Sequence, residues 1–157
     1  MKRIFLLGFT FILAFSICFG GTTETPEAFI QKIYMSDHKP MSKPEIDFTK
    51  RESLTRYFDG ALTDLFIIDF ECQKKEQGVC NLDFDPIYDA QDFDEETKDL
   101  KIVNVSGQPN VFNVTFTNLG TRTLIYNLKK TPKGWPISDI KYPEGPSLKE
   151  LLSREVK

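Results

Sequence analysis

The sequence predicts a single α+β domain in which helices come first and an antiparallel sheet follows. Apolar residues recur at helical spacing as far as Cys72, and from Leu100 onwards they alternate with the period of a strand. Between the two halves lies the acidic segment, residues 81–94, in which five Asp alternate with large apolar side chains and no Lys or Arg occurs. Helices followed by strands are typical of the α+β class, and 157 residues fit one such domain.

Residues 1–20 predict a cleaved secretory signal. Lys2 and Arg3 precede an uncharged, mostly apolar run of about 16 residues, and a cut after Gly20 would leave small residues at the −3 and −1 places. A membrane span needs roughly 20 apolar residues, so an uncleaved anchor is less favoured. Lipidation is also disfavoured, because Ile17 and not a small residue precedes Cys18. We therefore expect residues 21–157 to be a periplasmic or secreted domain without stable membrane insertion.

The charge balance disfavours nucleic acid as a partner. Loss of Lys2 and Arg3 with the signal leaves 18 basic against 23 acidic residues, a net charge of −5. Phosphate binding requires a concentrated basic face. The densest basic group, Lys129, Lys130 and Lys133, is interpreted as the solvated charges of a hairpin end.

Cys72 and Cys80 predict a structural disulfide. They are separated by seven residues, and in an oxidising compartment such an even pair usually closes. Closure of this short loop would contribute roughly 2.5 kcal/mol on the chain-entropy model. A redox pair and a zinc site are the alternatives, but redox motifs usually have two intervening residues and zinc would need two more soft ligands. We expect no cofactor and no metal.

The helical half is expected to contain two helices. The first begins at Thr25-Pro26-Glu27, with Thr25 as its cap and Pro26 at its first position, and ends near residues 36–37. A loop that holds His38, the only histidine, follows; one His limits nucleophilic triads and histidine-rich metal sites. The second, longer helix would start at a capping box formed by Thr49 and Glu52 and run to Cys72, with a glycine inside it at a cost of about 1 kcal/mol.

The β half is expected to be a meander of four strands and a short last helix. The strands are predicted at residues 100–106, 111–118, 121–130 and 135–142, and Ser147 with Glu150 forms a capping box for the helix. Helices against one face of a curved sheet would leave a cone with an open mouth, a common place for a pocket. The candidate pocket-lining residues are Phe112, Phe116, Tyr126 and Trp135. For Trp135, the only tryptophan, we favour a structural role, in which the side chain covers the rim of the sheet, over stacking on a ligand.

Two chemical interpretations of the acidic segment are considered first. An EF-hand calcium site does not fit, because the spacing counted from Asp83 or from Asp92 places unsuitable residues at the glycine position, and an irregular calcium site is the less favoured alternative that stays open. A carboxylate-dependent hydrolase would need two acids at a set separation, and this spacing is not diagnostic. The acids available for such catalysis are Asp83, Asp85, Asp89, Asp92 and Asp94.

Recognition and structure are the remaining interpretations of the segment. Exposed Asp among aromatic residues would suit a protein partner with a basic surface. Alternatively, the Asp side chains cap turns through their own backbone while Pro86 and Tyr88 pack inside. The partner-binding candidates are Asp83, Asp85, Tyr88, Asp89, Asp92, Phe93 and Asp94.

Three stretches together resemble an exported bacterial family known as domain of unknown function 3828. They are the acidic stretch Asp85-Pro86-Ile87-Tyr88-Asp89-Ala90-Gln91-Asp92, the strand Gly134-Trp135-Pro136-Ile137-Ser138-Asp139-Ile140-Lys141-Tyr142, and the ending Ser147-Leu148-Lys149-Glu150-Leu151-Leu152. The resemblance implies a fold similar to nuclear transport factor 2, a cone of helices against a curved sheet, and no established enzyme activity. Family members include lipoproteins, from which this chain departs at Ile17.

Taken together, these features predict a non-catalytic exported binding protein. It would be an immunity or inhibitor protein that neutralises a toxin acting in the periplasm, such as one directed at the cell wall. The inference that the partner is a toxin rests on analogy with other small exported α+β proteins. The alternative is a small-ligand carrier or envelope-maintenance protein that uses the pocket of the cone, and a hydrolase is the third candidate.

Overall fold

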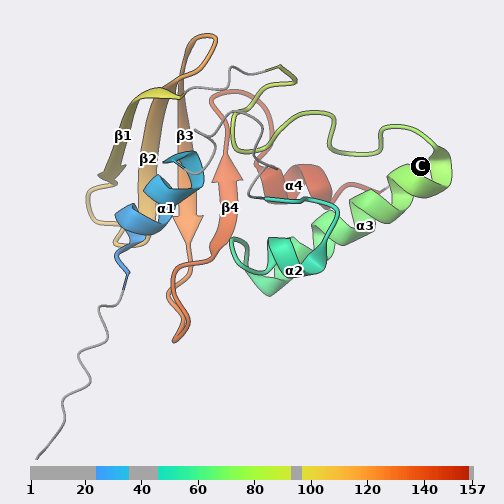
Figure 1. Cartoon of the computed structure of the whole chain (residues 1–157), viewed down its shortest axis with the longest axis horizontal. Coiled ribbons are helices and arrows are strands. Elements are labelled where there is room, and N and C mark those ends of the chain that lie inside the picture. Colours follow the sequence, from blue (N-terminus) through green and yellow to red (C-terminus); the bar gives the residue numbers. More distant parts are fainter. Residues whose placement is uncertain (1–23, 36–45, 93–96, 156–157) are drawn as a thin grey trace, which may run out of the picture.

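The computed structural model describes residues 24–35, 46–92 and 97–155 of the chain. It confirms an α+β fold with a four-stranded antiparallel sheet and a few helices (Figure 1). The elements in chain order are α1 (Pro26–Met35), α2 (Arg51–Leu54), α3 (Gly60–Glu76), β1 (Lys98–Asn104), β2 (Val111–Thr117), β3 (Thr121–Leu128), β4 (Ile137–Lys141) and α4 (Leu148–Leu152). The predicted signal, the His38 loop, Phe93 and Asp94 lie outside the described residues.

The sheet is the predicted meander, with the strands in the order β1-β2-β3-β4 and every neighbouring pair antiparallel. Side chains on β2 alternate strictly between buried and half-exposed, and those on β3 do so from Leu124 onwards, as expected for a sheet that packs on one face only. The buried face holds Phe112, Val114 and Phe116 from β2. Helix α1 packs against this face, and the centroids of the Tyr34 and Phe116 rings are 5.0 Å apart. On the other face the hydroxyls of Thr115 and Thr123 form a hydrogen bond of 2.9 Å.

Helix α1 begins as the sequence predicts. The Thr25 hydroxyl accepts the backbone N–H of Ala28 at 3.2 Å, and Pro26 takes the first helical position. One face of the helix is buried in the core, comprising Phe29, Ile30, Ile33 and Tyr34. Helix α1 lies in front of the strands in Figure 1, so it separates the buried face of the sheet from solvent.

The single long helix expected from Thr49 to Cys72 is wrong. The Thr49 side chain donates to Asp47 at 2.6 Å instead of capping a helix, and Lys50 precedes the four-residue α2 without a side-chain cap. Helix α3 starts anew at Gly60, where Asp59 accepts the N–H of Leu62 at 2.9 Å. Gly60 is therefore an N-terminal residue of the helix and does not carry the cost of an interior glycine.

The sheet causes this break between α2 and α3. The N–H of Ile137 donates to the carbonyl of Tyr57 at 2.7 Å, and the N–H of Asp59 donates to the carbonyl of Ile137 at 2.8 Å. Residue Phe58 thereby forms a parallel bridge with the edge strand β4. The backbone between the helices is satisfied by the sheet, so an unbroken helix through it is excluded.

The ends of the β half follow the prediction with shorter strands. Strand β4 begins at Ile137, so Trp135 precedes it, and β3 ends at Leu128, which leaves residues 129–136 as the β3–β4 hairpin end. Helix α4 has the predicted capping box between Ser147 and Glu150. Within the described ranges, no helix combines the length and hydropathy that crossing a membrane requires.

Candidate functional site

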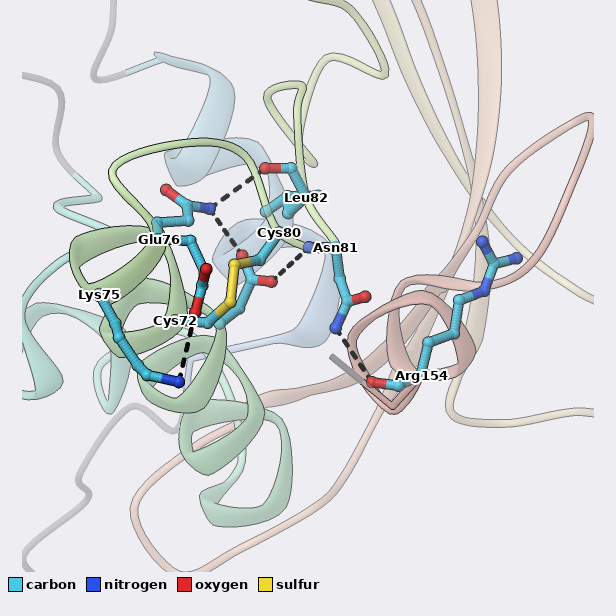
Figure 2. The surroundings of a disulfide bond; sticks show 9 residues. Cys72, Lys75, Glu76, Cys80, Asn81, Leu82 and Arg154 are labelled. Carbon is cyan, nitrogen blue, oxygen red and sulfur yellow. Dashed lines mark hydrogen bonds and ion pairs between the residues drawn. A yellow bond between two sulfur atoms is a disulfide. The ribbon is translucent and has the colours of Figure 1, made fainter. Parts of the chain in front are cut away.

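The upstream end of the acidic segment is fastened to the C-terminal part of α3 (Figure 2). Cys72 and Cys80 form the predicted pair, with their Cα atoms 6.2 Å apart. Asp69, which is 2% exposed, accepts the N–H of Asn81 at 2.7 Å with one carboxylate oxygen and the amide of Gln73 at 2.7 Å with the other. The Asn81 side chain also donates to the carbonyl of Arg154 at 3.2 Å. Covalent and hydrogen bonds therefore give the segment a fixed start.

Inside the segment, Asp85 organises a tight turn. Its Oδ1 accepts the N–H groups of Ile87 at 2.8 Å and Tyr88 at 3.2 Å, and its own N–H donates to the carbonyl of Ala90 at 2.9 Å. Ile87 and Tyr88 are buried, and the Tyr88 ring meets Phe116 edge-on at 6.0 Å. This is the arrangement of the structural interpretation: the Asp85 carboxylate caps backbone and the apolar neighbours dock on the sheet.

The remaining described acids of the segment differ in exposure. Asp83 and Asp92 are exposed, and Asp83 accepts a hydrogen bond of 3.4 Å from Gln91. Asp89 is half-buried with a left-handed backbone (φ 52°). Burial raises the pKa of the Asp89 carboxyl above its usual value, and the charge of Arg122 opposes this shift. Partner binding by these residues stays a prediction, as does any role of Phe93 and Asp94.

The predicted pocket-lining residues separate into two groups. Phe112, Phe116 and Tyr126 are at most 1% exposed and belong to the packed core, where the Tyr126 hydroxyl lies 2.9 Å from that of Tyr34. Trp135 is half-buried and lines a pocket at the edge of the fold. The sheet interior and Trp135 therefore do not share one cavity wall.

We name the pocket at Trp135 the Trp135 groove. It has a volume of about 450 Å³ and lies between the β3–β4 hairpin end, the junction of α2 with α3, and the start of α1. In Figure 1 this hairpin extends beyond the sheet between α1 and α2. The lining residues are Glu24, Phe29, Thr55, Arg56, Phe58, Asp59, Gly60, Lys129, Thr131, Pro132, Lys133, Gly134, Trp135 and Pro136.

A second hollow of about 410 Å³ shares Trp135 and the hairpin with the groove and also reaches Thr25, Pro26 and Lys130. The indole is held in place at this junction, because its Nε1 donates to the carbonyl of Glu24 at 2.8 Å. The Lys130 ammonium lies 5.5 Å from the centre of the ring, within reach of a cation–π contact. An aromatic floor and basic groups therefore meet at one place.

The sequence identified only half of this groove. The basic hairpin and Trp135 are visible in the chain as Lys129 to Trp135, and the basic group does lie at a hairpin end as predicted. The opposite wall consists of Arg56, Phe58 and Gly60, and it exists only because the helix breaks there. The signal that could have revealed it is Asp59-Gly60, an N-cap followed by a residue without a side chain.

Two other possible sites receive no function. A hollow of about 400 Å³ lies between α1 and β1, and its walls include Met35 and Thr97, which adjoin residues that the structure does not describe. In the described part of the chain, no three His, Cys, Asp or Glu side chains gather as metal ligands would.

Comparisons with protein-family models, curated proteins and solved structures find no match for this chain. The resemblance to domain of unknown function 3828 therefore stays a prediction, and the site is judged on its own geometry.

Proposed function

We propose that this protein is an exported, non-catalytic binding protein that holds a small ligand with an apolar body in the Trp135 groove. The observation that carries the proposal is a groove of about 450 Å³ with an aromatic floor, within the range of pockets that hold small molecules. Export is supported by the signal-like residues 1–20 and by the Cys72–Cys80 pair. The ligand-carrier alternative thus becomes the leading proposal.

The floor of the groove suits an apolar ligand. Trp135 lines the groove together with Pro132 and Pro136, while Phe58, which is 2% exposed, closes its base. Gly60 contributes no side chain to the opposite wall. A methyl group added to Gly60 would meet no atom within 4 Å, so the wall is open at that point. An aliphatic or flat aromatic body that covers these surfaces would remove apolar area from water.

Fluorescence of Trp135 provides a direct test, because it is the only tryptophan in the chain. The exported protein is titrated with decanol and with decanoate, and a saturable change in emission with at least one of them is expected. Gly60→Leu should abolish the change, because the new side chain fills the groove from a helical position without a strained backbone.

Ala61→Leu is the matched control. Ala61 follows Gly60 in the same helix turn, is exposed and does not line the groove, so this variant should bind as the wild type does. The proposal is rejected when no probe alters Trp135 emission in a saturable way, or when Gly60→Leu binds as tightly as the wild type.

The second candidate is partner recognition by the acidic segment, as an immunity or inhibitor protein against a periplasmic toxin would require. The observation in its favour is that Asp83 and Asp92 are exposed on a segment with a fixed start. Asp83→Asn with Asp92→Asn should then reduce recovery of a basic partner from periplasm without a change in folding. Equal recovery by both forms would exclude these two carboxylates. This second candidate also draws on the proposed likeness to the cone of nuclear transport factor 2, which is an analogy of fold and gives no function by itself.

A further inference from the structure

The acidic and basic side chains around the Trp135 groove differ in whether they already have partners within the protein. Its acids are engaged elsewhere: Glu24 forms an ion pair with Lys32 at 3.4 Å, and Asp59 accepts the N–H of Leu62 at the start of α3. The guanidinium of Arg56 pairs with Glu52 at 2.8 Å. The carboxylates on the walls are therefore occupied by groups of the protein itself.

The three lysines of the hairpin end have no such partners. Lys129 and Lys133 line the groove, and Lys130 and Lys133 line the second hollow that shares Trp135 with it. Among the described residues, none of the three forms an ion pair with a carboxylate. Three ammonium groups without an ion pair to a described carboxylate therefore stand beside the groove of a domain whose expected net charge after export is −5.

This local positive charge is next to the apolar floor and not separate from it. Trp135 is shared by both hollows, and Lys130 lies 5.5 Å from the centre of its ring. A molecule whose body covers Trp135 and Phe58 would bring one end to the lysines. The groove is therefore complementary to an amphiphile with a negatively charged head group.

We propose, resting on the proposed ligand-binding function, that the Trp135 groove selects amphiphilic anions. The aliphatic or aromatic body lies against Trp135 and Phe58, and the carboxylate or phosphate head is held by Lys129, Lys130 and Lys133. Neutral molecules with the same body bind less tightly, and cationic ones are disfavoured. The lysines supply specificity for charge, and the floor supplies contact area.

Three probes with one common chain test this selection: decanoate, decanol and decylamine. Each is titrated into the exported wild-type protein at pH 7 while Trp135 emission is recorded. Decanoate is expected to bind about tenfold more tightly than decanol, because exposed charge pairs attract only weakly, and decylamine is expected to bind most weakly. The preference for decanoate should shrink as salt is added, because screening acts on exposed charges.

Replacement of Lys129, Lys130 and Lys133 by Gln should remove the preference for decanoate and leave the affinity for decanol unchanged. The control replaces Lys74, Lys75 and Lys149 by Gln, which changes the net charge equally at lysines outside the groove. This control should retain the preference. If it loses the preference to the same degree, overall charge and not the hairpin end is responsible, and the inference is overturned.

Decyl phosphate and inorganic phosphate distinguish the kind of head group. Tighter binding of decyl phosphate than of decanoate assigns a phosphate head and the reverse order assigns a carboxylate head, both in agreement with an amphiphilic anion. Saturable binding of inorganic phosphate as tight as that of decyl phosphate would overturn the inference, because the body would then contribute nothing. Equal affinity for decanol and decanoate rejects the charge selection alone, whereas failure of every chain-bearing probe rejects the proposed function itself.

Discussion

At the scale of single residues, Asp89 combines an unusual backbone with an unfavourable charge. Its φ of 52° is a conformation that Asn and Gly tolerate and that costs Ala about 1 kcal/mol. Burial raises the pKa of its carboxyl, Glu144 adds to this shift, and Arg122 opposes it. The ionised form is therefore less favourable in the folded protein than in the unfolded chain.

The substitution Asp89→Asn should stabilise the protein in a pH-dependent way. A carboxyl with a raised pKa in the folded state contributes most favourably below its unfolded pKa of about 3.9, and this contribution is lost as the pH rises through the folded pKa. The free energy of unfolding of Asp89→Asn relative to the wild type should thus rise with pH over that window and then remain constant. Urea denaturation between acidic and neutral pH measures it.

The comparison for this prediction is Asp89→Ala. Alanine also removes the charge but is unfavourable at a left-handed position, so it should be less stable than Asp89→Asn at every pH by about 1 kcal/mol. A difference between wild type and Asp89→Asn that does not vary with pH would contradict the assignment of a raised pKa.

Short sequence motifs predicted some helix caps and the disulfide correctly and predicted one helix cap wrongly. Thr25, Ser147 and the Cys72–Cys80 pair act as their sequence neighbourhoods predict, because their partners lie within a few residues in the chain. Thr49 matched the same capping pattern as Ser147, yet its hydroxyl donates to Asp47. A short motif states which bonds are available, and a nearby competing acceptor decides which one forms.

At the scale of elements, the end of α3 is held to the acidic segment by two independent means. The Cys72–Cys80 pair closes a short loop, and Asp69 receives the N–H of Asn81. Joint replacement of Cys72 and Cys80 by Ala should lower the free energy of unfolding by roughly 2.5 kcal/mol, because the unfolded chain regains the entropy that the closed loop removes. Urea denaturation of the oxidised protein and of this variant measures the loss.

The reduced wild-type protein is the internal control for the cysteine prediction. It should match the variant in stability, and addition of reductant should leave the variant unaffected. Equal stability of the oxidised and reduced wild-type protein would show that Asp69 and the packing of α3 alone hold the corner.

The elements of the β half were more predictable than those of the helical half. The period of two along β2 and β3 follows from burial of a single face, and short turns set the order of strands. The break at Tyr57 depends on hydrogen bonds to Ile137, far away in the chain. The Trp135 groove could not be predicted from the sequence for the same reason, because residues at this break form one of its walls.

At the scale of the whole molecule, Tyr34 joins three separate parts of the fold. It comes from α1, its hydroxyl lies 2.9 Å from that of Tyr126 on β3, and it donates to the carbonyl of Ile87 in the acidic segment at 3.1 Å. Both tyrosines are fully buried, and burial is the main reason that the pKa of each lies above its usual value. The hydroxyl pair is therefore uncharged at neutral pH.

The two hydroxyls should be energetically coupled. Tyr34→Phe keeps the ring but leaves the Tyr126 hydroxyl and the Ile87 carbonyl without this partner, so it should cost about 1–3 kcal/mol. Tyr126→Phe should cost less, because the Tyr34 hydroxyl still has Ile87. The double variant should be less destabilised than the sum of the single ones, by at least about 0.5 kcal/mol. Urea denaturation of the four proteins completes the cycle. Strict additivity of Tyr34→Phe and Tyr126→Phe would contradict the prediction, because it would show that the two hydroxyls do not stabilise each other.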